Sequence, residues 1–190
     1  MDLRRSVGRV AVVAAVLGLA PRARAQEGAG PPIPKPTAEH KILAAEEGTW
    51  DAVVKTYMGG PDAEPAVSKG TEVNTVMTGG LWVVSQFKGD FGGTPFEGRG
   101  QFGYDPLKKK YVGTWVDSMM TTFARSEGHY DAATLTLSFE TQAMHEGSLR
   151  RYREVTETRA DGSQLYRHLT AMPDGTQFEM IRIEYRRRAP

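Results

Sequence analysis

Residues 96–117, FEGRGQFGYDPLKKKYVGTWVD, contain the pattern that decides the fold. Two runs rich in aromatic and β-branched residues, Phe96–Tyr104 and Lys110–Asp117, lie on either side of Asp105-Pro106. Aromatic and β-branched side chains favour strands, and Asp-Pro followed by lysines is typical of an exposed turn. We therefore predict an antiparallel hairpin, because so short a link cannot return the chain to form a parallel pair.

The same pattern continues along the chain from Thr49 onward. Links that contain Gly, Pro or Asp separate the runs, and no helical stretch between them could serve as a parallel crossover. The ten predicted strands are Thr49–Tyr57, Thr71–Thr78, Leu81–Phe87, Phe96–Tyr104, Lys110–Asp117, Thr121–Tyr130, Thr134–Glu140, Leu149–Thr158, Gln164–Ala171 and Thr176–Arg187. The sequence thus predicts an all-β fold, an antiparallel up-and-down β-barrel of about ten strands, because closure removes unpaired edges. A barrel of this size has room for a small ligand.

The chain before the strands divides into a targeting segment, a spacer and a helix. Residues 1–25 combine arginines with an apolar run of eleven residues and end in Ala23-Arg24-Ala25, a pattern typical of a signal peptide. The run is too short to span a bilayer, which takes roughly 20 residues. Four prolines in residues 26–36 indicate an extended spacer. Thr37 is placed to cap a short helix over residues 38–47, which begins a single barrel domain, residues 37–188.

The charge balance changes when the predicted signal peptide is removed. The 190 residues carry 24 Lys and Arg against 23 Asp and Glu, and the 165 residues after Ala25 carry 19 against 22. This slightly acidic balance argues against nucleic acid as a partner. The absence of cysteine excludes disulfides, thiol catalysis and a lipid-modified amino terminus. We expect a protein exported to a periplasm or outside the cell, by the general secretory or the twin-arginine route, without stable membrane insertion of the mature chain.

Several short motifs together resemble a known family. They are Gly79-Gly80-Leu81-Trp82, Phe96-Glu97-Gly98-Arg99-Gly100, Gly103-Tyr104-Asp105, Trp115-Val116-Asp117-Ser118-Met119 and Glu127-Gly128-His129-Tyr130-Asp131. In order and spacing they resemble the bacterial family catalogued as domain of unknown function 1579, over about residues 36–187. The resemblance implies a lipocalin-like or calycin-like barrel, in agreement with the strand pattern, and it implies no activity.

Candidate ligand-binding residues follow from strand alternation. The candidates for the barrel cavity are Trp82, Trp115, Asp117, Met119, Tyr166 and His168. Alternation places Trp115 and Asp117 on one face of their strand, where an indole wall and a carboxylate would fix a ligand's orientation. Two alternatives stay open: Asp117 accepts hydrogen bonds from nearby backbone or an arginine to close the barrel end, and Met119 fills a gap there.

The histidines lack the spacing of a metal site. His40, His129, His145 and His168 form no HxxxH or HxH pattern, so no metal site is predicted. His168 shares a strand face with Tyr166, an arrangement similar to that of the nitrobindins, ten-stranded barrels that bind haem through a late histidine. The glycine-rich amino-terminal pattern of that family is missing after Trp50. We predict no cofactor and keep haem at His168 as an alternative.

Arginines and glycines supply two further patterns. Arg150, Arg151 and Arg153 place positive charge on both faces of one strand, where they either protect a solvated edge or place one arginine, such as Arg151 or Arg153, inside against a ligand carboxylate. Residues 98–103 match GxGxxG, but a strand follows instead of the helix that a dinucleotide site requires, so we expect Gly98 and Gly100 to allow a close approach.

Three functional hypotheses remain. The first is binding of a small apolar or amphipathic molecule in the barrel, and the second is a structural or protein-interaction module that uses the outer strand faces. The third is a haem-binding or enzymatic barrel. No catalytic residues are predicted, because the chain has no GxSxG motif and no spacing that singles out a nucleophile and its base.

Overall fold

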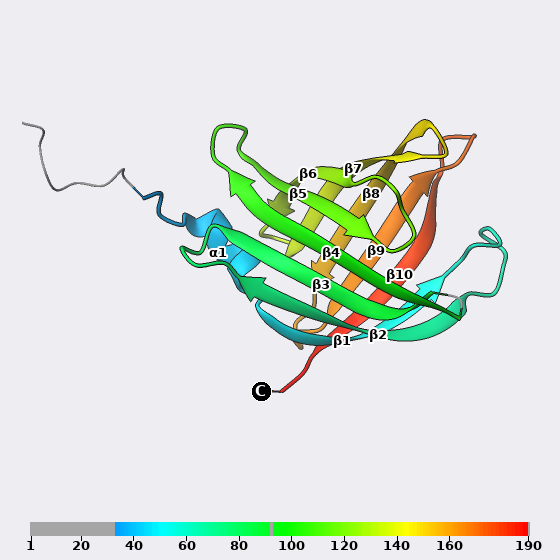
Figure 1. The fold of residues 1–190 in the computed structure, drawn as a ribbon, viewed down its shortest axis with the longest axis horizontal. Coiled ribbons are helices and arrows are strands. Elements are labelled where there is room, and N and C mark those ends of the chain that lie inside the picture. The colour runs from blue at the N-terminus through cyan, green and yellow to red at the C-terminus, as the bar shows by residue number, and fades with distance from the viewer. Residues whose placement is uncertain (1–32, 92, 190) are drawn as a thin grey trace, which may run out of the picture. The chain divides into compact units, whose positions relative to one another are not determined.

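The computed structural model describes residues 33–91 and 93–189 (Figure 1). The predicted signal peptide and most of the predicted spacer lie outside these residues. The elements are α1 (Ala38–Ala44), β1 (Gly48–Thr56), β2 (Ala66–Val76), β3 (Trp82–Phe91), β4 (Thr94–Asp105), β5 (Lys110–Asp117), β6 (Ala124–Asp131), β7 (Thr136–His145), β8 (Ser148–Thr158), β9 (Gln164–Ala171) and β10 (Gln177–Arg187).

The strands form one closed antiparallel barrel. Each strand pairs with the next in the sequence, and β1 pairs with β10, with Trp50 opposite Arg187 and Thr56 opposite Ile181. The predicted fold class is therefore confirmed. β2 begins earlier than its composition suggests, because Ala66–Gly70 pair with the second half of β1. Pairing to a neighbour, rather than β propensity, extends this strand.

Alternation along β1 identifies the inner face of the barrel. Ala52 and Val54 are buried, and their partners Tyr185 and Ile183 are buried with them. Residues directly opposite in neighbouring strands share a face, so this register fixes the inward positions around the whole barrel. The buried hydrophobic side chains form two clusters. One comprises Trp50, Ala52, Val54, Phe87, Ile183 and Tyr185, and the other Leu43, Val83, Tyr111 and Phe139.

Helix α1 lies at one end of the barrel, against β3 and β4 (Figure 1). His40 and Leu43 are its buried residues, and the His40 ring meets the Tyr104 ring edge-on with centroids 5.8 Å apart. The Tyr111 hydroxyl donates a hydrogen bond of 3.3 Å to the carbonyl of Glu39. The loops that follow β1, β3, β5, β7 and β9 lie at the opposite end, which we call the loop end.

The helix ends at Ala44, three residues before the predicted end. The backbone carbonyls of residues 45–47 accept hydrogen bonds from outside the helix. The Arg187 guanidinium donates to those of Ala45 and Glu47, and the Trp50 indole nitrogen donates to that of Glu46 at 3.0 Å. These hydrogen bonds satisfy the carbonyls of the three residues that follow the helix. They also connect the start of β1 to the end of β10.

Glycines on β4 and β5 make room for aromatic rings on the inner face. A Cβ added to Gly98 would overlap the Trp115 ring, and one added to Gly113 would overlap the Phe102 ring. Gly100 lies opposite Trp115 in the register. The GxGxxG match is therefore part of a strand, and the close approach expected at Gly98 and Gly100 is made by aromatic side chains.

Candidate functional site

Trp115 and Asp117 lie on inward positions of β5, near the loop end. The Trp115 indole nitrogen donates a hydrogen bond of 3.1 Å to the Asp117 carboxylate, and the backbone N–H of Met119 donates to the same carboxylate at 2.8 Å. Asp117 therefore fixes both the indole and the turn after β5. The hydrogen bond from Met119 is of the kind expected in the alternative in which Asp117 accepts from nearby backbone at the barrel end. Met119 is 55% exposed in that turn.

Trp82 lies on the outer face of β3 and does not line the interior. Its neighbour Val83 is 4% exposed and pairs inside the barrel with Phe102. Trp82 pairs with Gly103, covers it from outside and stays 40% exposed. The prediction that Trp82 lines the cavity is corrected on this point, since successive side chains on a strand must face opposite sides.

Tyr166 and His168 lie on inward positions of β9, where they meet residues of β8. His168 pairs with Glu154 and with Ile181, and Tyr166 pairs with Ile183. The Tyr166 hydroxyl lies 3.3 Å from His168 Nδ1, and a Glu154 carboxylate oxygen lies 3.4 Å from the same nitrogen. The Tyr152 and His168 ring centroids are 4.6 Å apart. We call Tyr152, Glu154, Tyr166 and His168 the interior polar cluster.

Glu72 and Tyr185 extend this polar surface toward β1 and β2. The Tyr185 hydroxyl donates to the Glu72 carboxylate at 2.9 Å, and the Asn74 amide donates to it at 3.0 Å. Burial raises the pKa of Glu72 above its ordinary value despite these hydrogen bonds. Burial, followed by the nearby carboxylates of Glu154 and Glu72, raises the pKa of Tyr166 well above its ordinary value. The Tyr166 phenol is therefore protonated at neutral pH.

Sequence reasoning missed Tyr152, Glu154, Glu72 and Tyr185. Alternation alone groups Tyr152 with Glu154, and Tyr166 with His168, but it does not tell which face points inward. The glutamates lie on inward positions, where an unpaired carboxylate is costly, and each has a partner on another strand: His168 for Glu154 and Tyr185 for Glu72. Tyr185 lies 113 residues from Glu72, so no local pattern relates them.

The register corrects the alternative in which Arg151 or Arg153 meets a ligand carboxylate inside the barrel. Arg151 pairs with Gln142, and Arg153 pairs with Glu140. Both pairs alternate with Phe139, Thr141 and Ala143, which are buried on the inner face. The two arginines therefore point outward. Glu154, next to Arg153, points inward, and so does Arg150 at the loop end of β8.

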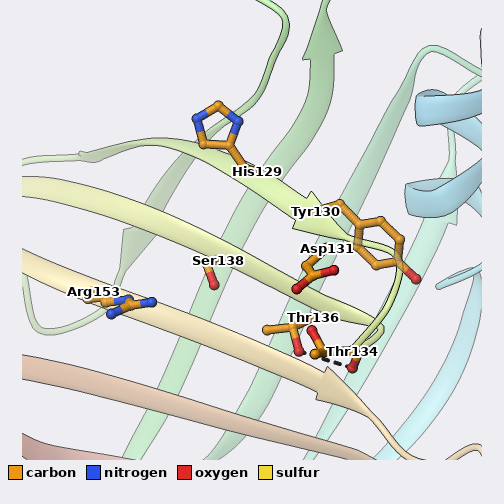
Figure 2. Close-up of a pocket in the computed structure, with 7 residues that line it drawn as sticks. All are labelled: His129, Tyr130, Asp131, Thr134, Thr136, Ser138 and Arg153. Atoms are coloured by element: carbon orange, nitrogen blue, oxygen red, sulfur yellow. Dashed lines mark hydrogen bonds between the residues drawn. The ribbon is translucent and has the colours of Figure 1, made fainter.

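A shallow depression of about 360 Å³ lies on β6, β7, β8 and the turn after β6 (Figure 2). Its lining residues are His129, Tyr130, Asp131, Thr134, Thr136, Ser138 and Arg153. Figure 2 shows His129 and Arg153 well apart from the Asp131 carboxylate. Asp131 accepts a hydrogen bond of 2.8 Å from the backbone N–H of Ala133, and Thr136 donates to the carbonyl of Thr134 at 3.1 Å. These contacts shape a turn and do not converge on a common point.

Neither a metal-binding cluster nor a membrane-spanning helix occurs in residues 33–91 and 93–189. Within this part of the chain, no three His, Asp or Glu side chains are grouped so that they could hold a metal ion. No helix in the same part has the length and apolar character needed to cross a membrane.

Comparison with known proteins identifies the fold and a family model. Residues 35–187 match the model described as a protein of unknown function, DUF1579. No curated protein matches the chain. The crystal structure of Rv2717c from M. tuberculosis superposes with a TM-score of 0.60 at 10% identity, covering 80% of this chain and 99% of that one. A de novo designed fluorescence-activating β-barrel has a TM-score of 0.36 at 20% identity, covering 77% and 97%. The first of these similarities concerns the fold alone.

Proposed function

The chain belongs to the DUF1579 family of proteins of unknown function, and we propose that its barrel binds a small apolar or amphipathic molecule beside the interior polar cluster. One observation carries this proposal. The side chains of His168 and Glu154 lie on inward positions in the middle of their strands, yet they keep 16% and 19% of their exposure. Solvent reaches such side chains only through the barrel interior, so this part of the interior is accessible.

An apolar wall lies toward the loop end of the interior. Phe96 and Trp115 are partly buried against the cluster that contains Phe87, and the Phe87 and Phe96 ring centroids are 5.9 Å apart. Sites for small molecules combine such walls with a few polar groups that fix orientation. Trp115 and the interior polar cluster supply both kinds of contact, which supports a ligand with an apolar body and a polar group.

The binding test uses the two tryptophans that face opposite sides of the barrel wall. We expect the neutral fluorescent probe N-phenyl-1-naphthylamine to bind the mature protein and Trp115→Ala to weaken its Kd about tenfold, a loss of about 1.4 kcal/mol. Trp82→Ala is the matched control, because it removes an indole from the outer face of the same wall. Equal effects of the two substitutions, or no binding by the wild-type protein, would contradict the proposal.

Native mass spectrometry of protein purified from the compartment of export tests the same proposal without a chosen probe. We expect an added mass that Trp115→Ala reduces and Trp82→Ala leaves in place. The experiment also reports the oligomeric state. The haem alternative makes a different prediction: a Soret absorption band in the purified protein, which His168→Ala removes.

A further inference from the structure

The charges on the inner face are unevenly distributed between the ends and the middle of the barrel. The inward bases at the ends are Arg150 and His145 at the loop end and Arg187 at the helix end. The Arg187 guanidinium lies over the Trp50 ring, 4.2 Å from its centroid, and donates to backbone carbonyls. Along the ten strands, all of which the structure describes, no lysine occupies an inward position.

The middle of the barrel carries carboxylates. Glu154 lies beside His168 on neighbouring strands, and Glu72 accepts hydrogen bonds from Tyr185 and Asn74. Tyr166 lies within the field of both carboxylates, which help to raise the pKa of its phenol. Its hydroxyl is therefore an uncharged donor and brings no positive charge to the site. Glu154 and Glu72 are thus the carboxyl groups of this part of the inner face, and the side chain of Glu154 stays partly exposed there.

The aromatic side chains of the same region act in the same direction. Tyr152 lies beside His168, and Trp115 and Phe96 form the apolar wall near the loop end. The face of an aromatic ring carries negative electrostatic potential and attracts an ammonium group within about 6 Å of its centroid. This observation is independent of the carboxylates, and it too favours a cation.

A ligand carboxylate would meet acidic side chains in the middle of the barrel. Arg151 and Arg153 point outward, and the inward Arg150 lies at the loop end of β8, so the inward charged side chain in the middle of β8 is Glu154. Burying a third carboxyl group, that of the ligand, beside Glu154 and Glu72 would add repulsion to the cost of desolvation. An ammonium group instead gains attraction from Glu154, and its charge favours the ionised form of Glu72, whose pKa burial raises.

We propose that the barrel selects amphipathic amines, with the ammonium group beside Glu154 and the apolar body against the Trp115 wall. This inference rests on the proposed function and specifies the chemical class of its ligand. It assigns binding roles to Glu154 and Glu72.

The test compares three compounds that share one apolar chain and differ only in the polar group: decylamine, decanol and decanoate. Each competes with N-phenyl-1-naphthylamine for the wild-type protein at neutral pH and at concentrations below micelle formation. We expect decylamine to bind at least about tenfold more tightly than decanoate, with decanol between them. Equal binding of all three, or preference for decanoate, overturns this inference and leaves the proposed function standing. If neither these compounds nor the probe binds, the proposed function itself fails.

Variants then locate the selectivity. Glu154→Gln keeps the shape of the side chain and removes its charge, so we expect the preference for decylamine over decanol to fall about tenfold. Glu140→Gln is the matched control: it lies on the outer face of β7, opposite Arg153, and should leave that preference within about twofold. The ratio of two affinities is measured within one variant, so altered stability does not imitate the result. Glu72→Gln provides a second variant with the same expectation. An unchanged ratio in both interior variants overturns the assignment.

Discussion

At Gly98 the inner wall of the barrel has no side chain, because the Trp115 ring covers the backbone there. We expect Gly98→Ala to lower the free energy of unfolding by about 1–3 kcal/mol, since the added methyl group must displace a packed indole. Urea denaturation measures the change. In the Trp115→Leu background the same substitution should cost less, because the smaller side chain leaves space for the methyl group. Additive effects of the two substitutions would show that the ring does not cause the cost.

Glu72 gives the stability a pH dependence whose sign follows from burial. The folded-state pKa of Glu72 is raised above the value of 4.5 that an exposed glutamate has. Between these two values the folded state binds more protons than the unfolded state, so the free energy of unfolding falls as pH rises through this window. We expect Glu72→Gln to remove this decline. Urea denaturation of both proteins between about pH 4 and pH 8 tests it, and parallel curves would contradict it.

Glu127 supplies a control of opposite sign. Hydrogen bonds from Lys108 and Lys110 lower the pKa of Glu127 to about 2. Its stabilising contribution is therefore present above about 4.5 and is lost as pH falls toward 2. The contribution is small, because the group is exposed and the ion pairs are screened by solvent. Glu127→Gln should leave the stability curve above about pH 5 unchanged in shape, whereas Glu72→Gln should change it there.

Helix α1 stabilises the barrel through side chains that pack into the core at the helix end. Leu43 is 5% exposed and belongs to the cluster of Val83, Tyr111 and Phe139. We expect Leu43→Ala to lower the free energy of unfolding by about 2–4 kcal/mol, because it leaves a cavity at the helix end. Lys41→Ala is the control on the same helix: Lys41 is exposed, so its effect should stay within about 0.5 kcal/mol. Equal losses of stability for Leu43→Ala and Lys41→Ala in denaturant titrations would mean that the packing of Leu43 does not stabilise this end of the barrel.

The strand pattern predicted the elements and their order but not the direction of each face. In β5 alternation grouped Trp115 with Asp117 correctly, because their spacing is local. In β3 both faces carry large apolar residues, so the choice between Trp82 and Val83 depends on the barrel register, which pairs Val83 with Phe102 inside and Trp82 with Gly103 outside. The same limit applies to the interior polar cluster. Glu154 occupies an inward position because of long-range register, whereas composition alone predicts a charged residue at the surface.

Closure of the barrel joins the two ends of the domain. β1 and β10 pair over seven positions, from Trp50 opposite Arg187 to Thr56 opposite Ile181. The same junction holds Tyr185, which donates to Glu72 on β2, and Arg187, which donates to carbonyls of the segment between α1 and β1. The last strand therefore completes both the interior polar surface and the helix end. Neither set of contacts can form before β10 is in place, so the candidate site depends on the whole fold.

Export is the remaining prediction at the scale of the whole chain, and it concerns residues outside the described part. We expect the exported protein to begin at Gln26, because Ala23 and Ala25 are the small residues that a signal peptidase requires before its cleavage point. Amino-terminal sequencing of protein from the periplasm or the medium tests this directly. Ala25→Phe should block cleavage, whereas Ala20→Val, in the apolar run, should not.

A double Arg4→Lys, Arg5→Lys variant separates the two export routes: the general secretory route tolerates it, and the twin-arginine route does not. Uncleaved protein retained in the cytoplasm would contradict export, and a barrel that matures there would have to find its ligand among cytoplasmic molecules.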